Sequence, residues 1–105
     1  MKGLAKSWLG FANEDRIACE RLLDTGGIEG VVAFHAQQVV EKSLKAVIVA
    51  AGSQPPRVHD LTRLHAKSLE VLGPPRPSHG ELEEMVSCAA DVYAAAKSMV
   101  GRGLR

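Results

Sequence analysis

The stretch from about residue 29 to residue 51 combines a narrow polar stripe with apolar residues on most of its remaining circumference. At about 100° per residue, a helix places four polar side chains of this stretch on one line: His35, Gln38, Lys42 and Lys45. The apolar positions around that line are Val31, Val32, Phe34, Val39, Val40, Leu44, Val47 and Ile48. The pattern predicts a long helix packed on several sides, whose polar line needs partners from another helix, a second subunit or a ligand.

Helical spacing also predicts a first helix over roughly residues 3 to 24, which ends where Gly26 and Gly27 supply a left-handed stop. The apolar face expected for this helix consists of Leu4, Trp8, Phe11, Ala12, Ala18, Cys19 and Leu22. Because the connection at the two glycines is short, we expect the first two helices to pair as a hairpin.

Two further helices are expected in the second half of the chain. The third begins at Asp60, its expected N-cap, after the rigid Pro55–Pro56 connection. The fourth begins at a capping box of Ser78 and Glu81, and its apolar stripe comprises Leu82, Met85, Val86, Ala89, Tyr93, Ala96 and Val100. No useful segment alternates between polar and apolar residues, so the chain predicts one all-α domain over residues 1–105, an antiparallel up-and-down four-helix bundle.

Composition narrows the functional classes. The 105 residues carry a net charge of +1, so contact with nucleic acid requires a local patch rather than a general positive field. No stretch approaches the roughly 20 apolar residues of a membrane span, and no signal peptide precedes the first helix, which favours a cytoplasmic protein with no membrane contact. Cys19 and Cys88 are expected to be reduced, and neither they nor the histidines have the spacing of a metal site, so we expect no metal and no cofactor.

Asp15 lies in the middle of the apolar face of the first helix, where a carboxylate needs a partner or a polar pocket. One interpretation is an ion pair with Lys42 or Lys45 on the neighbouring helix, and the other is a supporting role in a site. His35 and Gln38 present the same choice, because they either bond within the bundle or donate to a ligand.

A phosphate site on the second helix is the functional alternative. Lys42 and Lys45 are one turn apart and can reach the same anion, with His35 and Gln38 one turn earlier. Arg57 and His59 approach from the loop before the third helix, where Asp60 either supports the site or serves only as a cap.

Three groups of residues together resemble the HEPN domain (higher eukaryotes and prokaryotes nucleotide-binding). They are Trp8, Ala12 and Asp15, then the run from Phe34 through Gln38 to Glu41–Lys42 and Leu44–Ala46, and then Pro56–Leu61 with its His59–Asp60–Leu61 step. The resemblance implies a helical bundle that forms homodimers. It also implies a partnership with a minimal nucleotidyltransferase, typical of prokaryotic toxin–antitoxin pairs.

Many members of that family are metal-independent ribonucleases, whose signature is an Arg followed by a His about four to six residues later. None of the arginines here has a His at that distance, and the nearest approach is Arg76 with His79. We therefore identify no catalytic residue and expect a nucleotide- or RNA-phosphate-binding partner subunit rather than an enzyme. The alternatives are a ribonuclease toxin with a diverged active site, or a non-catalytic dimerisation scaffold whose expected interface is formed by the first helix and the Ala-rich last helix.

Overall fold

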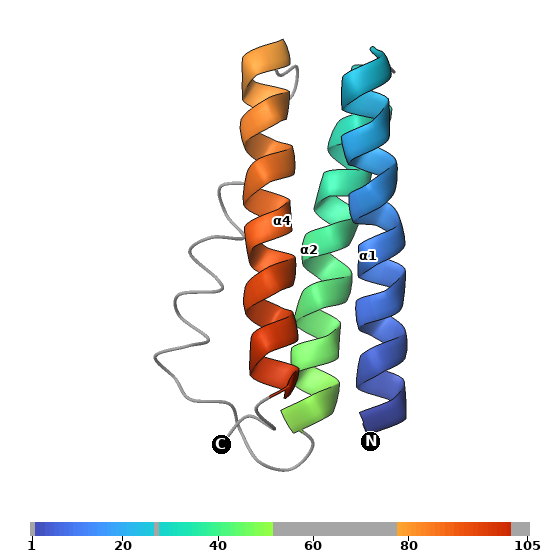
Figure 1. The fold of residues 1–105 in the computed structure, drawn as a ribbon, viewed down its shortest axis with the longest axis vertical. Coiled ribbons are helices and arrows are strands. Elements are labelled where there is room, and N and C mark those ends of the chain that lie inside the picture. Colours follow the sequence, from blue (N-terminus) through green and yellow to red (C-terminus); the bar gives the residue numbers. More distant parts are fainter. Residues whose placement is uncertain (1, 27, 52–77, 102–105) are drawn as a thin grey trace.

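Three long helices form the part of the molecule that the computed structural model describes, namely residues 2–26, 28–51 and 78–101. They are α1 (Lys2–Thr25), α2 (Glu29–Ala51) and α4 (His79–Gly101). α1 and α2 lie side by side as an antiparallel hairpin, and α4 packs along them, running in the direction opposite to α1 (Figure 1). The all-α class and the α1–α2 hairpin predicted from the sequence are confirmed. The expected third helix and its Asp60 cap lie outside the described residues.

The ends of the helices follow the predicted stop and start signals. Gly26 has a φ of +75°, the left-handed conformation that glycine adopts without a steric penalty, and its N–H donates to the carbonyl of Leu23. At the start of α4, the Glu81 N–H donates to Ser78 Oγ (3.2 Å) and the Ser78 N–H donates to Glu81 Oε1 (3.0 Å). These bonds with Ser78 hold the pKa of the Glu81 carboxyl below its usual value. The predicted capping box is therefore present.

The core lies where the three helices meet and is made of small and medium-sized side chains. From α2 it receives Val32, Ala36, Val39, Val40, Ala46 and Val47, and from α4 it receives Leu82, Met85, Val86, Ala89, Val92, Ala96 and Met99. The partly buried Tyr93 and Val100 pack against this core, so the predicted stripe of the last helix is close to the observed one. The many alanines and valines allow close approach between helices.

The predicted apolar face of α1 is wrong in part. Its fully buried residues are Ala5, Ala12 and Cys19, whereas Leu4 and Phe11 are about half exposed, at 47% and 48%. Trp8 and Leu22 of the predicted face are partly buried against the core, so the error concerns Leu4 and Phe11. The small residues on the buried side let α1 approach its neighbours closely.

Candidate functional site: a polar seam between α1 and α2

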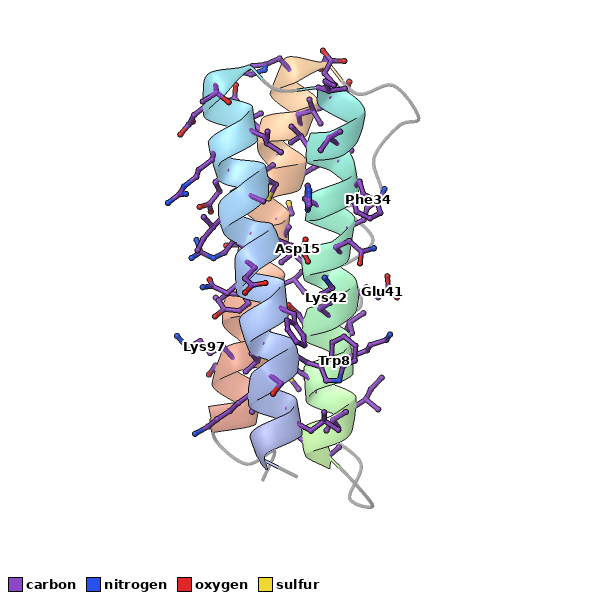
Figure 2. All side chains as sticks on the ribbon, turned by 90° about the vertical axis from the view of Figure 1, so that its right-hand side faces the viewer. Trp8, Asp15, Phe34, Glu41, Lys42 and Lys97 are labelled. Carbon is purple, nitrogen blue, oxygen red and sulfur yellow. The ribbon has the colours of Figure 1, made fainter. Side chains whose placement is uncertain are left out.

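Asp15 on α1 joins two side chains of α2 across the helix interface. Lys42 Nζ donates to Asp15 Oδ2 at 2.6 Å, and His35 Nδ1 lies 2.8 Å from Asp15 Oδ1. We call these three residues, Asp15, His35 and Lys42, the polar seam. Figure 2 shows Asp15 and Lys42 facing each other between the two helices. The helical repeat explains the register, because His35 and Lys42 are two turns apart on one face of α2 and Asp15 lies opposite the space between them.

The seam is partly closed to solvent. The Asp15 side chain is 10% exposed, and those of His35 and Lys42 are each 27% exposed. At this depth a carboxylate requires partners, and Asp15 has one on each of its oxygens. The seam is therefore a satisfied polar network within the bundle, with one edge open to solvent.

The contact with Asp15 also orients His35. A carboxylate can only accept a hydrogen bond, so the proton on the imidazole of His35 is placed on Nδ1. The other ring nitrogen, Nε2, has no hydrogen-bond partner among the described residues, and in the neutral ring it carries a lone pair. An Asp–His pair of this kind prepares Nε2 to accept a proton or a hydrogen bond from a ligand.

Gln38 and Lys45, the other two residues of the predicted stripe, lie further towards solvent beside Glu41. Gln38 Nε2 donates to Glu41 Oε2 at 3.3 Å, and Lys45 Nζ is 3.9 Å from Glu41 Oε1. Lys45 Nζ also lies 4.8 Å from the centroid of the Trp8 ring, a cation–π distance. The two carboxylates, Asp15 and Glu41, balance the two lysines, so an anion that binds here must compete with them.

These contacts decide between the alternatives that the sequence left open for Asp15. The ion pair predicted for Asp15 exists, and its partner is Lys42 rather than Lys45. The internal hydrogen bond foreseen as one alternative for His35 also exists. Arg57, His59 and Asp60 lie outside the described residues, so their predicted approach to the second helix stays a prediction, as does ligand binding by the stripe as a whole.

A border of exposed apolar side chains beside the seam was not predicted as part of a site. We call Leu4, Phe11, Val31, Phe34 and Ile48 the apolar border; Phe34 is 54% and Ile48 65% exposed. The Phe34 ring meets the His35 imidazole edge-on at a centroid distance of 5.5 Å, so the border adjoins the seam at Phe34. The sequence did carry a signal for this border. The second helix has more apolar residues than two neighbouring helices can bury.

The described residues contain neither a metal-binding cluster nor a membrane-spanning helix. No group of three or more His, Cys, Asp or Glu side chains among residues 2–26, 28–51 and 78–101 is arranged to hold a metal ion. None of the described helices is both long and apolar enough to cross a membrane.

The fold is an all-helical domain, and the polar seam links its first and second helices. The HEPN domain family model matches residues 5–98, which include nearly all of α1, α2 and α4. The chain therefore belongs to the HEPN domain family. Comparison with curated proteins and with solved structures gave no match.

Proposed function

We propose that this protein is the HEPN partner subunit of a minimal nucleotidyltransferase, in a cytoplasmic pair of the toxin–antitoxin type. We further propose that the open edge of the polar seam binds a nucleotide or RNA phosphate. The observation that carries the proposal is the arrangement of Lys42 and His35 on one face of α2, both held by Asp15 and both partly open to solvent.

The seam supplies donors suited to a phosphate. Lys42 uses one of its three N–H donors on Asp15, and among the described residues no other acceptor takes the remaining two, which can therefore bind a ligand. Lys45 is about half exposed, one turn away, and its contact with Glu41 is long enough to exchange for a phosphate at little cost. Because both cations already face carboxylates, we expect moderate affinity that decreases as the salt concentration rises.

Binding and cleavage of ATP and a short RNA, measured in EDTA, test this proposal. Wild type is compared with Lys42→Ala/Lys45→Ala and with a control, Lys6→Ala/Lys97→Ala, which removes the same charge from other helices. The proposal predicts binding that is lost in the α2 variant and kept in the control, without cleavage. Equal loss in both variants would show a general charge effect, and no binding to wild type would leave the seam as internal packing in a scaffold.

A ribonuclease is the second candidate, and the Asp15–His35 contact favours it. With Nδ1 held by Asp15, Nε2 of His35 is available to take a proton from a ribose 2′-hydroxyl, and Lys42 can stabilise negative charge on the phosphate. This candidate predicts cleavage in EDTA that is lost in His35→Ala. Cleavage that persists in His35→Ala would exclude this residue as the base.

We also propose that the protein is a homodimer that uses the apolar border. Its five members all lie on α1 and α2, and water would otherwise contact them. The sequence analysis expected the last helix to contribute, but α4 exposes no large hydrophobic side chain within its described residues, 79–101. Light scattering is expected to show a dimer for wild type and a monomer for Phe11→Ser/Phe34→Ser. A monomeric wild type at micromolar concentration contradicts this proposal.

A further inference from the structure

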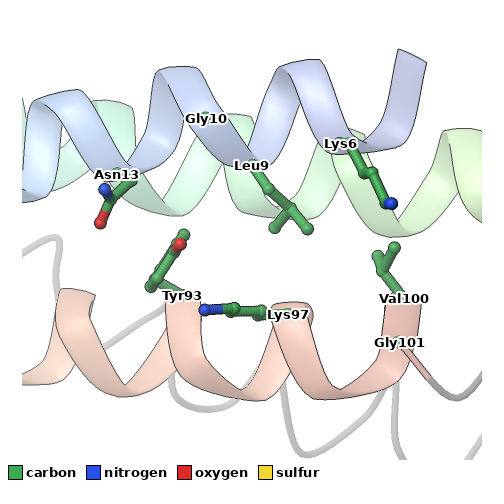
Figure 3. Close-up of a pocket in the computed structure, with 8 residues that line it drawn as sticks. All are labelled: Lys6, Leu9, Gly10, Asn13, Tyr93, Lys97, Val100 and Gly101. Carbon is green, nitrogen blue, oxygen red and sulfur yellow. The ribbon is translucent and has the colours of Figure 1, made fainter. Parts of the chain in front are cut away.

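The molecule has a cavity that belongs neither to the seam nor to the apolar border. It has a volume of about 540 Å³ and lies between α1 and α4, lined by Lys6, Leu9, Gly10, Asn13, Tyr93, Lys97, Val100 and Gly101. Figure 3 shows these side chains facing one another from the two helices. In Figure 2, Lys97 lies on the side of the molecule away from Phe34 and Glu41. We call this cavity the α1–α4 groove.

The sequence explains why the helices leave this space. Gly10 and Gly101 have no side chains, and a Cβ built on either one meets no atom within 4 Å. The floor is apolar, because Leu9 is buried and Val100 and Tyr93 pack against the core. Cavities of this size are typical of sites for small organic molecules.

Two lysines line the groove, one from each helix. Lys6 reaches from α1 towards α4 next to Val100, and Lys97 directs its ammonium group towards Tyr93 (Figure 3). Within the described residues, neither lysine forms an ion pair, and no carboxylate lines the cavity. This distinguishes the groove from the polar stripe of α2, where Lys42 faces Asp15 and Lys45 faces Glu41.

The end of the groove at Tyr93 is held in place by neighbouring side chains. The Arg16 guanidinium lies 5.6 Å from the centroid of the Tyr93 ring, Arg16 Nε donates to Asn13 Oδ1 (2.9 Å), and Arg16 pairs with Glu20 (3.1 Å). These contacts fix the ring as one wall. They leave the Asn13 amide and the Tyr93 hydroxyl as the neutral hydrogen-bonding groups of the lining.

We propose that the α1–α4 groove binds a small amphiphilic organic anion, with its anionic group at one of the two lysines and an aromatic or aliphatic body on the floor. The apolar floor provides most of the contact area, and the ammonium groups select a negative charge. The few neutral polar groups are too sparse to recognise a sugar or a base, which separates this ligand class from the phosphate ligand proposed for the seam.

Two fluorescent probes of similar shape separate the contributions of charge and shape. Anilinonaphthalene sulfonate is anionic, and phenylnaphthylamine is its neutral counterpart. We expect Lys6→Met/Lys97→Met to weaken binding of the anionic probe by roughly two- to fivefold, as for one exposed charge contact, and to leave the neutral probe nearly unaffected. The control is Arg21→Met, which removes an exposed positive charge from α1 outside both proposed sites.

Filling the cavity provides the second test. Gly10→Leu places a side chain in open space inside the groove, so we expect it to fold and to lose binding of both probes. The control is Gly3→Leu, on the same helix, where an added Cβ also meets nothing but which does not line the groove. Circular dichroism checks the folding of each variant. If Gly10→Leu does not fold, the lysine variants provide the test of the proposal.

Two results would overturn the proposal. One is unchanged probe binding in a folded Gly10→Leu, and the other is equal weakening of the anionic probe by the two charge variants. Loss of binding in Phe11→Ser instead of in the groove variants would place the probe on the apolar border and would equally reject the groove.

Discussion

The ion pair between Asp15 and Lys42 makes a quantitative prediction about stability. At the observed 2.6 Å, Coulomb's law gives about 1.6 kcal/mol in water and about 6 kcal/mol at an effective dielectric constant of 20. The side chains are 10% and 27% exposed, so the pair lies between these limits, and the loss of hydration offsets part of the gain. We expect a net coupling of about 1 to 3 kcal/mol, well above the value for a surface pair.

A double-mutant cycle with Asp15→Ala, Lys42→Ala and the double variant measures this coupling from urea unfolding. Lys42→Ala is expected to cost the most of the three, because it leaves a nearly buried carboxylate with His35 alone. The control cycle uses Glu41 and Lys45, whose atoms are 3.9 Å apart and whose side chains are about half exposed, and we expect at most ~0.5 kcal/mol there. Equal coupling in the two cycles would refute the reasoning from burial.

Three further predictions concern sites away from the seam. Ser43→Ala is expected to raise stability by about 0.5 to 1 kcal/mol in urea unfolding, because Ser43 Oγ is buried with no hydrogen-bond partner in the described structure; a loss of stability would reveal a missing partner. Gly10→Ala should stabilise α1 by about 1 kcal/mol, because an added Cβ meets no atom there. Gly26→Ala should destabilise the protein, because the φ of Gly26 is +75°. Equal effects of the two substitutions on thermal unfolding would contradict this contrast. Burial, followed by the charge of Glu20, raises the pKa of the Cys19 thiol from 9.0 to about 11. The unfolded thiol therefore loses its proton first, and stability should fall by about 2 to 3 kcal/mol between those two pH values. Cys19→Ala should lack this part of the pH dependence, and an identical profile for the variant would refute the assignment.

Local signals in the sequence were sufficient to predict much of the described fold. The helix ends at Gly26 and the capping box of Ser78 and Glu81 depend on a few adjacent residues, and the structure shows both. For Asp15, an ion pair with Lys42 or Lys45 was one of two interpretations, because a carboxylate on an apolar face needs a partner, and the structure shows the pair with Lys42. Short-range rules therefore predicted the described helix ends but left the partner of Asp15 open.

The orientation of α1 could not be predicted in the same way. Its large residues Leu4 and Phe11 suggested the buried face, but the rotation of a helix about its axis is set by how closely its neighbours approach. The α1–α4 groove was equally hidden from the sequence, because its lining comes from residues 6–13 of one helix and residues 93–101 of another, which antiparallel packing brings side by side. Contacts between distant segments require the three-dimensional arrangement.

The most direct test of the proposed function is to locate the ligand on the protein. Amide and side-chain NMR shifts of isotope-labelled protein are recorded during titration with ATP and then with a short RNA. We expect the largest shifts on His35, Gln38, Lys42 and Lys45, with weaker effects near Asp15. Shifts confined to the α1–α4 groove, or no shifts at millimolar ATP and saturating RNA, would contradict a phosphate site at the polar seam.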